Sequence, residues 1–137
     1  MGLPGSGKTT LADQLAKELY DAGKAVTRLN ADAVRKTGND WDFSPEGRIR
    51  QAYRMMTMAD IAETDYVIAD FIAPLVKMRT IFNADYTVWI DTIKVGRFDD
   101  TNKAFIPPET YDIRVVTQDC VPWATIICNH LLAKSNV

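Results

Sequence analysis

Residues 2–9 can carry chemistry by themselves, because they read GLPGSGKT and match the pattern G-x-x-x-x-G-K-[ST] in full. The glycines allow a tight turn whose N–H groups point inward, and the helix that follows directs its positive end at the same point. In such a loop Lys8 reaches the β- and γ-phosphates of a nucleoside triphosphate, and the Thr9 hydroxyl holds Mg²⁺. The pattern therefore predicts ATP and Mg²⁺ as cofactors, with ATP bound by Gly2, Leu3, Pro4, Gly5, Ser6, Gly7, Lys8, Thr9 and Thr10.

Two carboxylates lie at the ends of short predicted strands, at the position where parallel sheets place their ligands. Asp32 follows the predicted strand at 25–29, and Asp70 ends the apolar strand predicted at 66–70. Either carboxylate can help to hold Mg²⁺, and Asp32 can also accept the proton of a substrate hydroxyl. The predicted metal ligands are therefore Thr9, Asp32 and Asp70. The alternatives are a helix cap for Asp32 and a strand end facing the solvent for Asp70.

The elements that must position these residues alternate between helix and strand. Helices are predicted over 8–22, 33–36, 45–64, 74–82 and 119–134, and strands over 25–29, 66–70, 86–91 and 111–116. The stretch 92–110 has little periodicity and is predicted to be a long loop. This order favours one domain over 1–137, with an α/β three-layer fold, a mainly parallel sheet and helices on both faces.

The strand that should lead into the phosphate loop is largely missing, because only Met1 precedes the loop. Two explanations are open. The natural chain begins upstream of Met1, or another segment or another chain fills the place of that strand.

Composition narrows the class of protein. The 16 basic and 18 acidic residues give a net charge of −2, which argues against a general nucleic-acid binder. No stretch reaches the roughly 18 apolar residues of a membrane span, and the N-terminus does not resemble a signal peptide. Cys120 and Cys128 are expected to be reduced thiols, so the expected location is the cytoplasm.

Four segments resemble the adenylylsulfate kinase (APS kinase) family of P-loop kinases, in the family's order. Residues 2–11 (GLPGSGKTTL) match G-L-P-G-S-G-K-[ST]-T-[LI], and residues 29–35 (LNADAVR) resemble L-D-G-D-x-[VL]-R. Residues 43–51 (FSPEGRIRQ) resemble F-S-x-E-D-R-x-E-N, and FIAP at 71–74 with Arg79 resembles F-I-S-P and its downstream arginine. Many kinases share the phosphate loop, so the three later segments make the resemblance specific.

The resemblance implies an ATP-dependent phosphotransferase of sulfate assimilation. Its acceptor would be the 3′-hydroxyl of adenosine 5′-phosphosulfate, which becomes 3′-phosphoadenosine 5′-phosphosulfate. Lys8 and Asp32 would be the catalytic residues. Phe43 and Phe98 would flank the acceptor's adenine, and two arginines would hold its phosphosulfate. The implied substrate-binding residues are Arg35, Phe43, Arg48, Gln51, Ile72 and Phe98.

Several positions depart from the family pattern. Asn30 replaces its first aspartate, and Gly47 and Gln51 replace the aspartate and asparagine of D-R-x-E-N. Ala73 replaces the serine of F-I-S-P, so no phosphoserine can form there and transfer is expected to be direct.

The lid is shortened, because the chain passes from Asp91 to Phe98 without the family's basic lid helix. A lid covers the nucleotide and excludes water, so a more open nucleotide site is expected.

Two other functions stay open. One is a P-loop kinase with a different acceptor, such as a nucleoside, a sugar acid or a nucleic-acid 5′-hydroxyl. The other is a degenerate kinase that binds nucleotide without catalysis. The retained Lys8, Thr9, Asp32, Arg35 and Arg48 favour an enzyme. The expected partner is a small molecule rather than a membrane or nucleic acid, and a homodimer is possible because 119–134 carries an apolar stripe.

Overall fold

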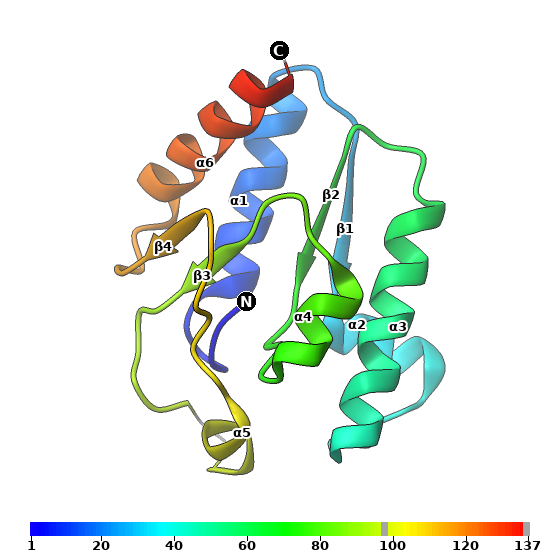
Figure 1. The fold of residues 1–137 in the computed structure, drawn as a ribbon. Coiled ribbons are helices and arrows are strands. Elements are labelled where there is room, and N and C mark those ends of the chain that lie inside the picture. The colour runs from blue at the N-terminus through cyan, green and yellow to red at the C-terminus, as the bar shows by residue number, and fades with distance from the viewer. Residues whose placement is uncertain (97–98, 136–137) are drawn as a thin grey trace.

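The computed structural model describes residues 1–96 and 99–135 and shows an α/β fold with helices on both sides of parallel strands (Figure 1). The elements in chain order are α1 (Lys8–Asp21), β1 (Val26–Asn30), α2 (Ala31–Gly38), α3 (Pro45–Ile61), β2 (Tyr66–Asp70), α4 (Val76–Phe82), β3 (Val88–Ile90), α5 (Asp99–Ala104), β4 (Ile113–Val115) and α6 (Cys120–Ser135). The predicted α/β class and the predicted order of strands are confirmed.

The helices form two layers because their apolar residues recur at helical spacing. In α1 the leucines at 11, 15 and 19 lie on one face and pack with α6. On the opposite side of the strands, α3 and α4 pack together around Ala52, Met55 and Met78. Each layer therefore has its own apolar core, and the strands separate the two.

The strands pair in two parallel sets. Strand β1 lies beside β2, with Asn30 opposite Asp70 at their carboxyl ends, and β3 lies beside β4. This register brings the carboxyl ends of β1 and β2 together at one edge of the fold (Figure 1). A hydrogen bond between Thr9 and Asp70 places the end of β2 beside the start of α1.

Met1 and Gly2 take the place of a strand next to β3. The amino group of Met1 donates to the carbonyl of Val88 at 2.8 Å, and the amide of Ile90 donates to the carbonyl of Met1 at 2.8 Å. Gly2 forms a parallel bridge with Ile90. Within the described residues β2 pairs with β1 alone, so the expected single sheet is divided into two pairs.

A cavity of about 600 Å³ occupies the space between β2 and β3. Its walls come from both helical layers and from both strands. Leu11, Leu15 and Ile127 lie on one side, and Ala59 and Phe82 lie on the other.

The prediction of a structureless loop over 92–110 is wrong in part, because Asp99–Ala104 forms the short helix α5. Tertiary contacts stabilise this helix, which explains why the sequence shows no helical repeat of apolar residues there. Thr101 is buried, and the Asn102 side chain exchanges hydrogen bonds with the backbone of Gly96 at 2.7 and 3.1 Å.

In the part of the chain that the structure describes, no helix combines the length and the apolar character that a membrane crossing requires.

Candidate active site

The phosphate loop turns tightly into α1 because two of its glycines adopt left-handed backbone angles. Gly5 has φ 85°, and Gly7, at the N-cap of α1, has φ 98°. A Cβ at Gly2 would lie 2.5 Å from the carbonyl oxygen of Ile90, so the loop also needs a glycine where it meets β3. Backbone angles therefore explain Gly5 and Gly7, and the contact with Ile90 explains Gly2.

Polar groups of the loop are arranged for an anion. Ser6 is 1% exposed, and its hydroxyl has no hydrogen-bond partner among the described residues. The Lys8 ammonium donates to the carbonyl of Leu3 at 3.0 Å and so lies folded over the loop. The Thr92 hydroxyl donates to the carbonyl of Ser6 at 2.7 Å and braces the loop from outside. An oriented helix end, a lysine and an unsatisfied hydroxyl fit phosphate oxygens.

Thr9 and Asp70 meet at the start of α1. The Thr9 hydroxyl donates to one carboxylate oxygen of Asp70 at 2.7 Å, and Asp70 is only 5% exposed. The amide nitrogen of Asn30 donates to the same carboxylate oxygen at 3.1 Å, while its amide oxygen caps α2 by accepting from the amide of Ala33. Asp70 is therefore an inward-facing carboxylate, and its solvent-facing alternative is wrong.

Asp32 lies in the first turn of α2 and is exposed. The side chain that caps this helix is that of Asn30, so the predicted alternative role of Asp32 as the cap is wrong. Asp32 is the second residue after β1, at the edge of the fold where α/β proteins place their ligands. Because its carboxylate is exposed there, a bound alcohol can reach it.

Arg35, Phe43 and Arg48 come together below the sheet edge. The guanidinium of Arg35 lies 4.3 Å from the centroid of the Phe43 ring, and that of Arg48 lies 5.7 Å from it. Both arginines are at least 95% buried, whereas Phe43 is 45% exposed. The ring is therefore a partly exposed apolar surface backed by two positive charges.

The same arginines also hold the loop that presents Phe43. Arg35 donates to the carbonyls of Asp40 and Asp42 at 3.1 and 3.2 Å, and Arg48 donates to the carbonyl of Phe43 at 2.8 Å. Burial lowers the pKa of Arg35 from its usual value. Arg48 also lies 3.4 Å from the Thr101 hydroxyl, which ties this loop to α5.

Gln51 faces the interior rather than an open site. It is 1% exposed, donates to the carbonyl of Ala31 at 3.0 Å and accepts from Arg54 at 2.9 Å. Arg54 in turn binds Asp40 at 2.9 Å, and the Arg50 and Arg54 hydrogen bonds hold the pKa of the Asp40 carboxyl well below its usual value. Gln51 therefore connects α2 to the loop that carries Phe43.

Gly47 marks a close approach that explains one departure from the family pattern. A Cβ at this position would lie 2.2 Å from the carbonyl oxygen of Asp42. We expect Gly47→Ala to lower the free energy of unfolding by about 1–3 kcal/mol, because the backbone at Asp42 must shift. Urea unfolding followed by circular dichroism measures this change.

Gly38→Ala is the matched control. A Cβ at Gly38 meets only the flexible Arg54 side chain, at 3.7 Å, and Gly38 ends α2 without a left-handed angle. The control is expected to be neutral or to raise stability by about 0.5 kcal/mol. Equal stability of Gly47→Ala and the unaltered protein would contradict the close approach.

Arg79 connects the FIAP segment to the chain beyond α5. It donates to the carbonyls of Ala73 and Ile106, the former at 2.9 Å, and its guanidinium lies 5.3 Å from the centroid of Phe105. Burial lowers its pKa to about 10. Ala73 has φ 46°, a left-handed angle that is uncommon for alanine and is held between these contacts.

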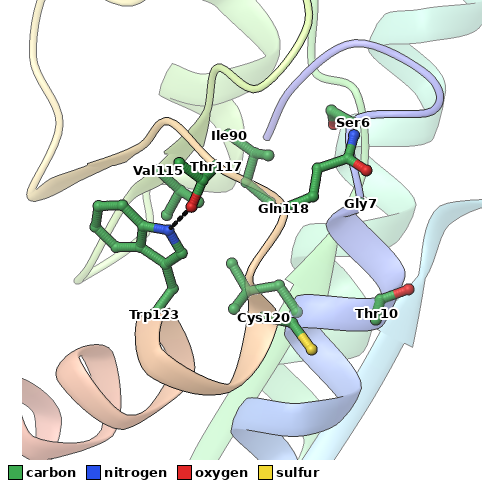
Figure 2. Close-up of a pocket in the computed structure, with 10 residues that line it drawn as sticks. Ser6, Gly7, Thr10, Ile90, Val115, Thr117, Gln118, Cys120 and Trp123 are labelled. Carbon is green, nitrogen blue, oxygen red and sulfur yellow. Dashed lines mark hydrogen bonds between the residues drawn. The ribbon is translucent and has the colours of Figure 1, made fainter.

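A small pocket of about 100 Å³ opens beside the phosphate loop (Figure 2). Its lining comes from the phosphate loop and the start of α1, from β3 and β4, and from the segment that leads into α6: Ser6, Gly7, Thr10, Leu11, Ile90, Val115, Thr117, Gln118, Cys120 and Trp123. The Trp123 indole donates to the Thr117 hydroxyl at 2.8 Å, and the Gln118 side chain extends toward Ser6 (Figure 2).

The sequence analysis did not identify Thr117, Gln118 or Trp123 as lining residues. No motif marks them, because they lie far along the chain from the loop. The only local signal was the position of Thr117 and Gln118 just after a predicted strand, where α/β folds place ligands.

Ile72 and Phe98 are the two remaining residues that the sequence predicts to bind the substrate. Ile72 is half-buried between β2 and α4, and Phe98 lies outside the described residues. Their predicted roles therefore stay predictions.

Comparison with known proteins points to one family. The family model described as adenylylsulphate kinase matches residues 1–95. The adenylyl-sulfate kinase of Bacillus pumilus is 39% identical over 83 residues, which cover 58% of this chain and 42% of that protein. The probable adenylyl-sulfate kinase of Bacillus subtilis is 32% identical over 102 residues, covering 72% and 48%. The matches therefore span less than half the length of these curated relatives.

A solved structure shares the fold. The APS kinase CysC of Mycobacterium tuberculosis, in complex with AMPPNP and APS, superposes with a TM-score of 0.78 over 96% of this chain and 94% of that chain. The two sequences are 21% identical, so the likeness concerns the fold.

Proposed function

Because this chain belongs to the adenylylsulphate kinase family, we propose that it transfers the γ-phosphoryl group of ATP to the 3′-hydroxyl of adenosine 5′-phosphosulfate. The products are ADP and 3′-phosphoadenosine 5′-phosphosulfate. The observation that carries the proposal is the intact phosphate loop with Thr9 bound to Asp70 at 2.7 Å, at the edge of the fold that also presents Asp32.

ATP binding rests on the loop and on the pocket beside it. The Ser6 hydroxyl, which is buried and has no hydrogen-bond partner among the described residues, is a proposed donor to the phosphates. Lys8 exchanges the carbonyl of Leu3 for a phosphate oxygen when ATP is bound. The small pocket extends from Ser6 and Gly7 toward Trp123, which supports it as the place over which the nucleoside part lies.

The residues around Thr9 fit Mg²⁺. The ion prefers oxygen ligands and is usually held by one or two carboxylates together with waters and substrate phosphates. The Thr9 hydroxyl and the buried Asp70 carboxylate supply such oxygens, with Asp32 as a further candidate ligand. When bound, Mg²⁺ neutralises charge on the β- and γ-phosphates.

Asp32 is the proposed catalytic base. In the transfer step the acceptor's 3′-oxygen forms a bond to the γ-phosphorus, the bond from that phosphorus to the β–γ bridging oxygen breaks, and the hydroxyl proton passes to the Asp32 carboxylate. The step is direct because Ala73 has no hydroxyl that could be phosphorylated.

The acceptor site is proposed at Phe43. Its exposed ring offers a stacking surface for adenine, and the buried charges of Arg35 and Arg48 attract the phosphosulfate. Gln51 contributes through Arg54 and Asp40, which hold the loop that carries Phe43, and Ile72 and Phe98 are proposed as further contacts of the acceptor.

An assay of ADP release with a panel of acceptors tests the proposal. Adenosine 5′-phosphosulfate is expected to give turnover that AMP, a nucleoside and a nucleic-acid 5′-hydroxyl do not give. Asp32→Ala is expected to remove most of it, about 10²-fold or more, whereas Asp60→Ala, which alters another exposed aspartate, is not. Turnover with another alcohol would overturn the acceptor, and ATP binding without turnover would indicate a degenerate kinase.

Location and assembly are further proposals. We place the protein in the cytoplasm because Cys120 and Cys128 are both free thiols. A homodimer is supported by exposed apolar residues on α6, Val121 and Ile126.

A further inference from the structure

Arg28 lies in the middle of strand β1, and neither the sequence motifs nor the proposed mechanism uses it. It lies two positions before Asn30, so both side chains project from the same face of the strand. Its side chain is 21% exposed and reaches the metal end of the site.

The guanidinium of Arg28 is fixed on three sides. It donates to the carbonyl of Ile68 at 3.0 Å, to Asp13 of α1 at 3.0 Å and to Asp70 at 3.1 Å. The side chain therefore has little freedom, and its charge is held against the buried end of β2.

The two oxygens of the Asp70 carboxylate have different partners. One accepts from Arg28 at 3.1 Å, and the other accepts from Thr9 at 2.7 Å. Asn30 lies within hydrogen-bond distance of both, at 3.4 and 3.1 Å. Arg28 thus binds Oδ1 of Asp70, and Oδ2 is left to accept from Thr9.

We propose that Arg28 is a positioning residue that orients Asp70 toward Thr9 and, by neutralising part of its charge, weakens divalent-cation binding at the site. This inference rests on the proposed function, because Thr9 and Asp70 are the proposed ligands. The positive charge of Arg28 lies close to a carboxylate that is a proposed metal ligand, so it repels the metal ion. Removing the charge of Arg28 therefore strengthens binding of the metal ion.

Electron paramagnetic resonance of Mn²⁺ in the presence of ADP tests the inference without an activity measurement. Arg28→Gln keeps a hydrogen-bond donor and removes the charge, so the Mn²⁺ dissociation constant is expected to fall about three- to tenfold. Arg28→Lys keeps the charge and is expected to stay near the unaltered protein. Arg28→Met is a second neutral variant for the case in which Arg28→Gln does not fold.

Two controls separate this role from a structural one. Asp13→Asn removes the exposed partner of Arg28 and leaves the Asp70 contact, so it is expected to leave Mn²⁺ binding unchanged. In an Asp70→Asn background, Arg28→Gln is expected to have no further effect, because Arg28 acts through that carboxylate.

The outcomes distinguish the inference from the function on which it rests. Unchanged or weaker Mn²⁺ binding in the neutral variants would overturn the role of Arg28 alone. An unaltered protein that binds no Mn²⁺ with ADP would overturn the proposed function, and the inference with it.

Discussion

Lys8→Met is expected to reduce ATP-dependent phosphoryl transfer by about 10²- to 10³-fold while the fold stays intact. Lys8 is the cation of the phosphate loop, and its ammonium donates to the carbonyl of Leu3 at 3.0 Å. In the transition state Lys8 faces the charge that develops on the transferred phosphoryl group. In other enzymes, removal of one such electrostatic contact lowers kcat by about 10²- to 10³-fold. Methionine keeps the aliphatic stem and removes the charge.

The measurement is kcat/KM for ATP, with the melting temperature recorded beside it. Lys17→Met on the same helix is the matched control, because Lys17 is exposed and its ion pair with Asp21 lies on the surface. The control is expected to stay within about twofold of the unaltered protein, as surface pairs contribute little. Retention of more than a tenth of the activity in Lys8→Met would contradict the role of this lysine.

Five valine and isoleucine residues joined ahead of Met1 are expected to raise the melting temperature by about 5–10 °C. The cavity of about 600 Å³ between β2 and β3 is lined in part by apolar residues of both helical layers, and the edge of β2 that faces it has no strand within the described residues. Met1 already pairs with β3, so an added segment would run parallel to both strands. Residues buried on both faces should be continuously apolar.

The extension also removes a buried amino group that is costly to charge. Burial lowers the pKa of the Met1 amino group to about 5, because the charged form is poorly solvated there. Joining the group to a peptide makes it a neutral amide that can still donate to Val88. Apolar burial has to exceed the entropy lost when five residues become ordered. We expect the free energy of unfolding to rise by about 2–4 kcal/mol.

An extension with the same length but a central proline and two lysines is the control, since it can neither pair with both strands nor fill an apolar space. Differential scanning calorimetry compares the three proteins. Equal melting temperatures for the apolar and the control extension would show that the cavity does not accept a strand.

Local patterns predicted the parts of the site that are close in sequence. The phosphate loop needs only glycines, Lys8 and a following helix, and the apolar repeat of α1 is visible in the sequence. The position of Asp70 after an apolar run also indicated a carboxylate at the sheet edge. Its contact with Thr9 depends on the register that sets Asn30 opposite Asp70, which is a pairing of distant segments that no local pattern contains.

The remaining features depend on tertiary contacts. Helix α5 is held by Thr101 and Asn102 rather than by its own periodicity. The small pocket joins Ser6 to Trp123 across almost the whole chain. Gly47 is required by the approach of Asp42, whereas comparison with the family pattern showed it only as an unexplained substitution.

The transfer of labelled phosphate tests the central claim most directly. The protein is incubated with ATP labelled at the γ-phosphorus, adenosine 5′-phosphosulfate and Mg²⁺, and the products are separated. The proposed function predicts label in 3′-phosphoadenosine 5′-phosphosulfate, dependent on Lys8 and Asp32. Label that stays in ATP, or that appears only as inorganic phosphate whether or not the acceptor is present, would contradict it.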